Sequence, residues 1–113
     1  MSTGTAPSER IAREVGSWPG VEVDRGELGE VAFKYGRREL GHVHGDHAAH
    51  FSFPRPVWHE LHAEGRIEGH PVFPGKTGPA QRRIAGDDDV TDVVELFRIN
   101  YERALAREAR TSA

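Results

Sequence analysis

Alternating apolar and polar residues predict two paired strands in the first half of the chain. Val31, Phe33 and Tyr35 alternate with smaller or charged residues, and a second alternating run follows over residues 38–44. Successive side chains of a strand face opposite sides of a sheet, so this pattern is typical of half-buried strands. The Gly36-Arg37 pair between the runs is a natural turn, which predicts an antiparallel hairpin.

Other apolar runs predict further strands and two short helices. Strands are expected at residues 21–24, 50–53, 66–73 and 81–84. Ser8 is expected to cap a short helix over residues 9–15. Pro54 and Pro56 can open a second helix, because proline is tolerated in the first helical turn, and Gly65 would end it at Glu64.

The clearest helix follows three aspartates at residues 87–89. Its apolar residues recur at spacings of three and four and therefore share one stripe: Val90, Val93, Val94, Phe97, Tyr101 and Leu105. The layout predicts an α+β fold over residues 8–107, with a single curled antiparallel sheet. This C-terminal amphipathic helix and one or two shorter helices would pack on the sheet. Residues 1–7 are expected to be a disordered tail and residues 108–113 a C-terminal tail.

Size and charge narrow the classes of function. At 113 residues the chain has room for one domain with one core. The net charge of −3 argues against nucleic acid as a partner, because duplex binding leaves a basic footprint. Without cysteine there is no disulfide and no thiolate nucleophile. No apolar run approaches the roughly 20 residues that span a bilayer, so a cytoplasmic protein with no membrane partner is expected.

Histidine carries the candidate chemistry. The chain has seven histidines, and His42 and His44 should point to the same face of their strand. With His70 from a neighbouring strand they could hold one divalent metal ion and leave a position open. They could equally form an acid–base pair that needs no cofactor. The competing interpretation, which we consider weaker, is a solvated sheet face without chemistry.

Glu39 belongs to the same candidate site only on one structural condition. It lies an odd number of residues from His42 and His44, so in a regular strand it would face the other side. A bulge near Gly41 would bring its carboxylate round to the histidines.

Other candidate sites are weaker. His47 is expected in a solvated turn, and His50 could belong to either face. His59 and His62 are three residues apart, whereas the zinc-binding helix motif needs histidines four apart, so both are expected on the surface. The aspartates at residues 87–89 are explained more simply as an acidic helix cap than as a cation site.

Several short motifs follow one another in order along the chain. The central motif is Arg38-Glu39-Leu40-Gly41-His42-Val43-His44-Gly45-Asp46. The supporting motifs are Phe51-Ser52-Phe53-Pro54, residues 57–61, Gly69-His70-Pro71 and residues 90–101. Together they resemble the luciferase-domain family, which includes the luciferases of fungal bioluminescence. The resemblance covers residues 18–105, and Glu39, His42, His44 and His70 match its recurring polar positions.

The resemblance implies a small-molecule enzyme, an oxidoreductase by analogy. Fungal luciferases oxidise a hydroxylated pyrone with molecular oxygen, so an oxygenated or aromatic substrate is expected here, without assuming light emission. His42 and His44 would act as base and orienting partner, Glu39 would fix an imidazole tautomer, and His70 would complete the polar wall. The alternative is a non-catalytic module that binds or senses a small molecule on the same scaffold. A structural protein with scattered surface histidines is the weakest option.

Overall fold

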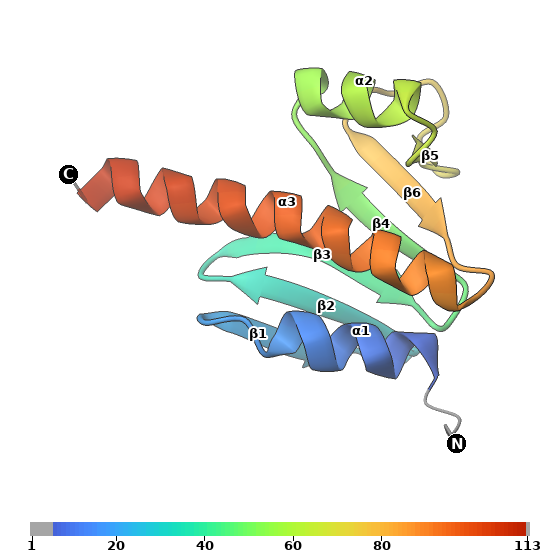
Figure 1. Cartoon of the computed structure of the whole chain (residues 1–113), viewed down its shortest axis with the longest axis horizontal. Coiled ribbons are helices and arrows are strands. Elements are labelled where there is room, and N and C mark those ends of the chain that lie inside the picture. Colours follow the sequence, from blue (N-terminus) through green and yellow to red (C-terminus); the bar gives the residue numbers. More distant parts are fainter. Residues whose placement is uncertain (1–5, 113) are drawn as a thin grey trace.

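The structure is a computed structural model that describes residues 6–112. Its elements in chain order are α1 (Pro7–Gly16), β1 (Val21–Arg25), β2 (Glu30–Tyr35), β3 (Arg38–His44), β4 (Ala48–Ser52), α2 (Arg55–Ala63), β5 (Glu68–Gly69), β6 (Pro79–Arg83) and α3 (Asp87–Ser112). Figure 1 shows the long helix α3 crossing the sheet, with its C-terminal end projecting beyond the strands.

The six strands form one antiparallel sheet in the order β1-β2-β3-β4-β6-β5. The first four strands pair in chain order, and β2 and β3 form the hairpin that the alternating pattern predicts. The chain then passes through α2, and β6 returns to pair with β4, which leaves the short β5 at the edge. The α+β prediction is therefore confirmed.

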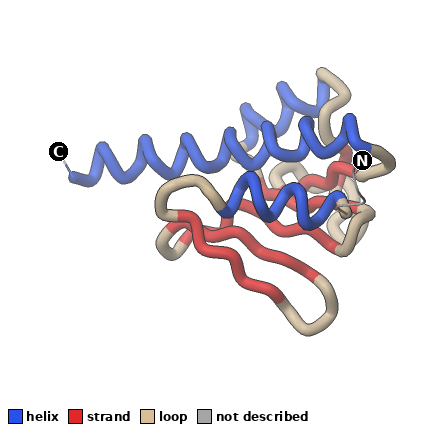
Figure 2. The backbone as a smooth tube through the Cα atoms, turned by 60° about the horizontal axis from the view of Figure 1, so that its bottom comes forward, coloured by secondary structure: helices blue, strands red, loops and turns tan. Residues whose placement is uncertain are grey.

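The helices lie on one side of the sheet and leave the other side open (Figure 2). Helices α1 and α3 contact each other, and between them and the sheet lies the core. Phe97 of α3 packs edge-on against Phe33 and Phe51, with ring centroids 5.0 and 4.7 Å apart. Burying one phenylalanine side chain stabilises a fold by about 1.5–3 kcal/mol, so these rings are a main attachment of α3 to the sheet.

A bulge interrupts β3 at Leu40. Phe33 pairs with Gly41, and the next residue, Lys34, pairs with Glu39, so Leu40 is an extra residue in the strand. Leu40 and Gly41 are consequently both buried toward the helices, although adjacent strand residues normally face opposite sides. The condition for Glu39 to join the histidine face, a bulge near Gly41, is therefore met.

Asn100 of α3 holds β3 and β4 where their pairing ends. The last paired residues at this end are His42 and His50, and beyond them the side-chain amide of Asn100 donates to the carbonyl oxygens of Leu40 and Ser52 at 3.0 and 3.2 Å. Asn100 is only 7% exposed. These hydrogen bonds join the two strands beyond their last paired residues.

Two local predictions are wrong. Ser8 is not a helix cap, because α1 begins at Pro7 with Ala6 as its N-cap, and the Ser8 amide instead donates to Asp46 at 2.9 Å. The strand expected at residues 66–73 reduces to Glu68–Gly69, so His70 lies in the segment after β5. Pro71 has no amide hydrogen to donate to a strand partner.

The ends of the domain also differ from expectation. Most of the predicted N-terminal tail, residues 1–5, lies outside the described residues, and Pro7 is already helical. The predicted C-terminal tail is helical as far as Ser112. Arg107 and Arg110 therefore lie on a helix and not in a tail.

Replacing Gly41 tests how tightly α3 packs on the bulge. An alanine Cβ would lie 2.8 Å from the Phe51 and Phe97 rings, and the glycine has a φ of 153°. We expect Gly41→Ala to lower the free energy of unfolding by about 1–3 kcal/mol, as measured by urea denaturation. The control is Gly86→Ala, because a Cβ there meets nothing within 4 Å. Equal stability of the two variants would contradict this account of the bulge.

Candidate functional site

A row of polar side chains crosses the open face of the sheet. In the strand register His42 of β3 lies opposite His50 of β4, His50 lies opposite Gln81 of β6, and Gln81 lies opposite Glu68 of β5. Directly opposed residues on one face have their Cβ atoms about 5 Å apart. The register therefore brings together side chains that are far apart in the sequence.

Glu39 and His42 form a close pair at one end of this row. Glu39 Oε2 lies 2.6 Å from His42 Nδ1. The pair exists because the Leu40 bulge returns Glu39 to the histidine face. A carboxylate only accepts hydrogen bonds, so Nδ1 of the imidazole must carry the proton that it donates. In the neutral ring, Nε2 is then left with a free lone pair.

His50 is fixed by a second polar chain. The Gln81 amide donates to Glu68 at 3.3 Å, so its carbonyl oxygen faces Nε2 of His50 at 2.9 Å. Glu68 is held in turn by Arg83, at 2.8 and 3.1 Å. His50 therefore donates through Nε2, which leaves the lone pair of a neutral ring on Nδ1.

His44 and His70 flank these residues. The His44 ring lies 4.8 Å from that of His42 and 4.6 Å from that of His50, centroid to centroid. His70 reaches the cluster from the segment after β5, with its ring 4.2 Å from His50. The backbone amide of Val72 donates to His70 Nδ1 at 3.1 Å. The proton of a neutral His70 is therefore on Nε2.

Two of these histidines resist protonation. Burial lowers the pKa of His50 most; the Gln81 hydrogen bond opposes the shift, and the neighbouring His70, His44 and His42 add to it. Burial also lowers the pKa of His70, followed by repulsion from His42 and His44. Both rings therefore favour the neutral form, which is the form that binds metals and accepts protons.

The geometry also defines a possible metal-binding group. His42, His44 and His50 each offer one nitrogen, and these atoms lie within 4.8 Å of one another. Two nitrogens bound to one tetrahedral Zn²⁺ ion at about 2.1 Å lie about 3.4 Å apart, so the rings would have to move closer together to share an ion. The sequence assigned the third position to His70. In the structure His50 lies between His70 and the other two.

A groove of about 360 Å³ runs beside the histidines on the open face. Ala32 and Lys34 of β2 form its floor, and Glu39, His42 and His44 form one wall. Its volume falls within the roughly 300–1,000 Å³ of small-molecule sites. The close Glu39–His42 pair is thus accessible from a space large enough for a small ligand.

The remaining candidates lie apart from this cluster. His47 is exposed in the β3–β4 turn. His59 and His62 are exposed on α2, where they lie against the Trp58 ring. Asp89 accepts hydrogen bonds from the backbone amides of residues 85 and 86 and from an arginine of β6, which is the capping role expected for the aspartate run.

Sequence reasoning left His50 undecided and did not single out Gln81 or Glu68. The signal for His50 was the three-residue turn after His44. Pairing His44 with Ala48 across that turn places His42 opposite His50. The signal for Gln81 and Glu68 was weaker, because their pairing depends on a long connection through α2.

The fold and this face define an α+β protein with a histidine-rich site on an open antiparallel sheet. A family model, the luciferase domain, matches residues 37–100, which is 64 of the 113 residues. The chain belongs to the luciferase-domain family, as its motifs predict. No curated protein and no solved structure shows significant similarity to it. Within residues 6–112, no helix has the length and apolar character of a membrane span.

The lowered pKa values of His50 and His70 predict a loss of stability in mild acid. Below about pH 6.5 the unfolded chain binds more protons than the folded one, so the free energy of unfolding should fall between about pH 7 and 5. We expect this fall in the free energy of unfolding to be smaller for His50→Gln than for the parent. Urea denaturation in the presence of a chelator measures it. His59→Gln, a change at an exposed histidine, should behave like the parent. If the free energy of unfolding falls as much in His50→Gln as in the parent, His50 is not a source of the acid sensitivity.

Proposed function

We propose that the protein is a small-molecule enzyme in which the Glu39–His42 pair removes a proton from an oxygenated or aromatic substrate. The observation that carries the proposal is the 2.6 Å contact between Glu39 Oε2 and His42 Nδ1. A carboxylate in this position holds the ring orientation and tautomer and stabilises the imidazolium that forms when Nε2 takes a proton.

The neighbouring histidines supply a complementary group. His70 carries its proton on Nε2, because Nδ1 accepts from Val72, and its lowered pKa keeps the ring neutral. A neutral imidazole can donate a hydrogen bond to a developing oxyanion. One imidazole that accepts a proton and another that donates a hydrogen bond are the two groups that enolate formation requires.

The surroundings of the site support this substrate class. The Phe73 ring lies 5.2 Å from His70, and Phe73 and Val72 are 47% and 70% exposed. An aromatic ligand could cover this apolar surface while its oxygen atoms face the imidazoles. Removal of a proton would leave an electron-rich carbanion, which can react with molecular oxygen without a cofactor. Light emission is not part of the proposal.

The role of Glu39 can be measured with Glu39→Gln. We expect it to slow proton exchange and oxygen uptake by roughly 10²–10⁴-fold, with a hydroxylated 2-pyrone carrying an aromatic substituent as the probe. Histidine-ring ¹H–¹⁵N NMR of the free protein should show Nδ1–H for His42 in the parent and loss of that preference in the variant.

The matched control is Glu102→Gln, because Glu102 lies on α3 and, among the described residues, forms an ion pair with Arg98 alone, at 3.0 Å. It should retain the parent rates and the parent His42 signal. Saturable binding of the probe with neither proton exchange nor oxygen uptake would instead identify a binding module.

A divalent metal site is the second candidate for the same residues. It is favoured by the separation of at most 4.8 Å among the donor atoms of His42, His44 and His50. Glu39 would then support the His42 ligand, since ligating histidines usually donate their other nitrogen to a carboxylate or carbonyl. Three imidazoles with an open position suit zinc, iron or copper.

The metal candidate predicts which substitution abolishes binding. After loading with Zn²⁺, tag-free protein should hold one ion by mass spectrometry, and His50→Ala should lose it as fully as His42→Ala. His70→Ala should retain the ion, because His50 lies between His70 and the other rings. Loss of the ion in His70→Ala with its retention in His50→Ala would favour the ligand set expected from the sequence, His42, His44 and His70. If the parent protein binds no ion, the metal candidate is eliminated.

A further inference from the structure

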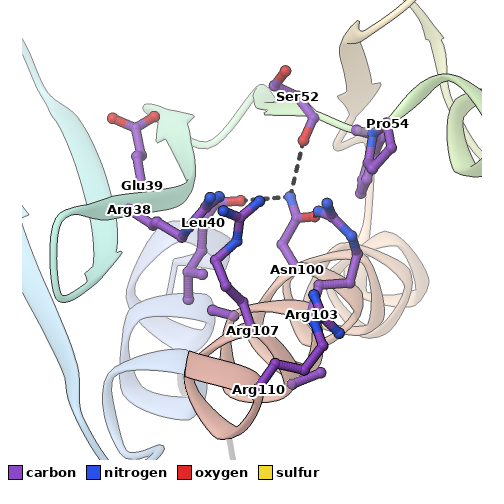
Figure 3. A pocket seen from close by; sticks show the side chains of 12 residues that line it. Arg38, Glu39, Leu40, Ser52, Pro54, Asn100, Arg103, Arg107 and Arg110 are labelled. Carbon is purple, nitrogen blue, oxygen red and sulfur yellow. Dashed lines mark hydrogen bonds between the residues drawn. The ribbon is translucent and has the colours of Figure 1, made fainter. Parts of the chain in front are cut away.

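A second cavity lies on the other side of β3, under the C-terminal half of α3. It has a volume of about 490 Å³. Four arginines line it, Arg38 from the start of β3 and Arg103, Arg107 and Arg110 from α3. Figure 3 shows the side chains from the two elements reaching toward the same space. The three helical arginines share a face because their spacings are four and three.

These arginines lack acidic partners, in contrast to most of the others. Within residues 6–112, none of the four forms an ion pair with a carboxylate, whereas six arginines elsewhere do: Arg10, Arg25, Arg66, Arg82, Arg83 and Arg98. Glu39 is the acidic residue at the cavity, but its carboxylate points away to His42 (Figure 3). The chain has more acidic than basic residues, so this local excess of positive charge is a departure from its composition.

The cavity also has one arginine that is held in place. Asn100 is buried, and its side-chain oxygen accepts from Arg103 Nη1 at 2.9 Å while its amide donates to β3 and β4. Burial lowers the pKa of Arg103, and the nearby charges of Arg38 and Arg107 lower it further. Like charges held this close repel one another, and an anion between them would relieve the repulsion.

Helix stabilisation does not explain the whole arrangement. Arginine near a helix C-terminus interacts favourably with the helix dipole, but the effect is confined to the last turn. Only Arg110 lies in the last turn of α3. Arg103 lies two turns earlier, and Arg38 comes from a strand, so the dipole gives no reason for them to meet.

We propose that this cavity binds a small organic molecule carrying at least two negative charges on phosphate or carboxylate groups. The planar guanidinium fork matches both groups with paired hydrogen bonds. The volume lies within the roughly 300–1,000 Å³ of small-molecule sites, which leaves room for an organic portion beside the anionic groups. The site is separate from the histidine face and does not depend on the function proposed for it.

Calorimetric titration with pyrophosphate and with citrate at constant ionic strength tests the proposal. We expect saturable binding of at least one, and the tighter of the two identifies the phosphate or the carboxylate class. Arg103→Gln and Arg107→Gln should each weaken binding roughly 10- to 100-fold, since hydrogen bonds to charged groups contribute most strongly. The Arg107 side chain is exposed and donates no hydrogen bond to the described residues, so its variant is expected to fold.

The control is Arg13→Gln, which removes the same charge from an exposed position on α1 and should bind like the parent. Binding that Arg107→Gln and Arg13→Gln weaken equally would reduce the effect to net charge and overturn the proposal. Absence of saturable binding by the parent would overturn it as well. Tighter binding of a single-stranded oligonucleotide, with a steep salt dependence, would also overturn it in favour of a nucleic-acid surface.

Discussion

The arrangement of this domain depends on one extra residue in β3. If β3 were regular, Glu39 would face the helices, where its carboxylate would have to be desolvated against the aromatic side chains that hold α3. Inserting Leu40 returns Glu39 to the open face and adds a buried aliphatic side chain to the core. Gly41 completes the bulge because Phe51 and Phe97 occupy the space that a side chain would need. The same local irregularity therefore produces both the packing of α3 and the acid–histidine pair.

Much of the fold could be predicted from the sequence because it rests on local patterns. The hairpin over residues 30–44 and the amphipathic helix α3 are encoded by simple periodicities, and glycine between strand residues marked the bulge. The site was predictable in part, because His42 and His44 share a face in any strand. The inclusion of His50 depended on strand register, and the pairing of β4 with β6 depends on how a long connection folds. Neither the strand register nor the path of that connection can be predicted from strand periodicity alone.

The short segment from Arg38 to Leu40 separates two environments of opposite character. On the open face, Glu39 orients the His42 imidazole, and burial lowers the pKa values of the neighbouring His50 and His70. On the helix side, Arg38 joins three arginines from α3, and the Leu40 carbonyl accepts from Asn100. Because Glu39 points to the histidines, it cannot neutralise the arginines behind it. The direction of one carboxylate thus determines the electrostatics on both sides of the strand.

The open face places a physical demand on any substrate of the proposed reaction. Helices α1, α2 and α3 lie on the other side of the sheet (Figure 2), so the described part of the chain offers no helix to exclude water from His42 and His44. Proton transfer and charge stabilisation are more effective when water is displaced. A flat aromatic molecule could displace it by lying across the imidazoles and the exposed Phe73 ring, whereas a small aliphatic acid could not. The proposed reaction would therefore favour substrates whose own apolar surface covers the open face.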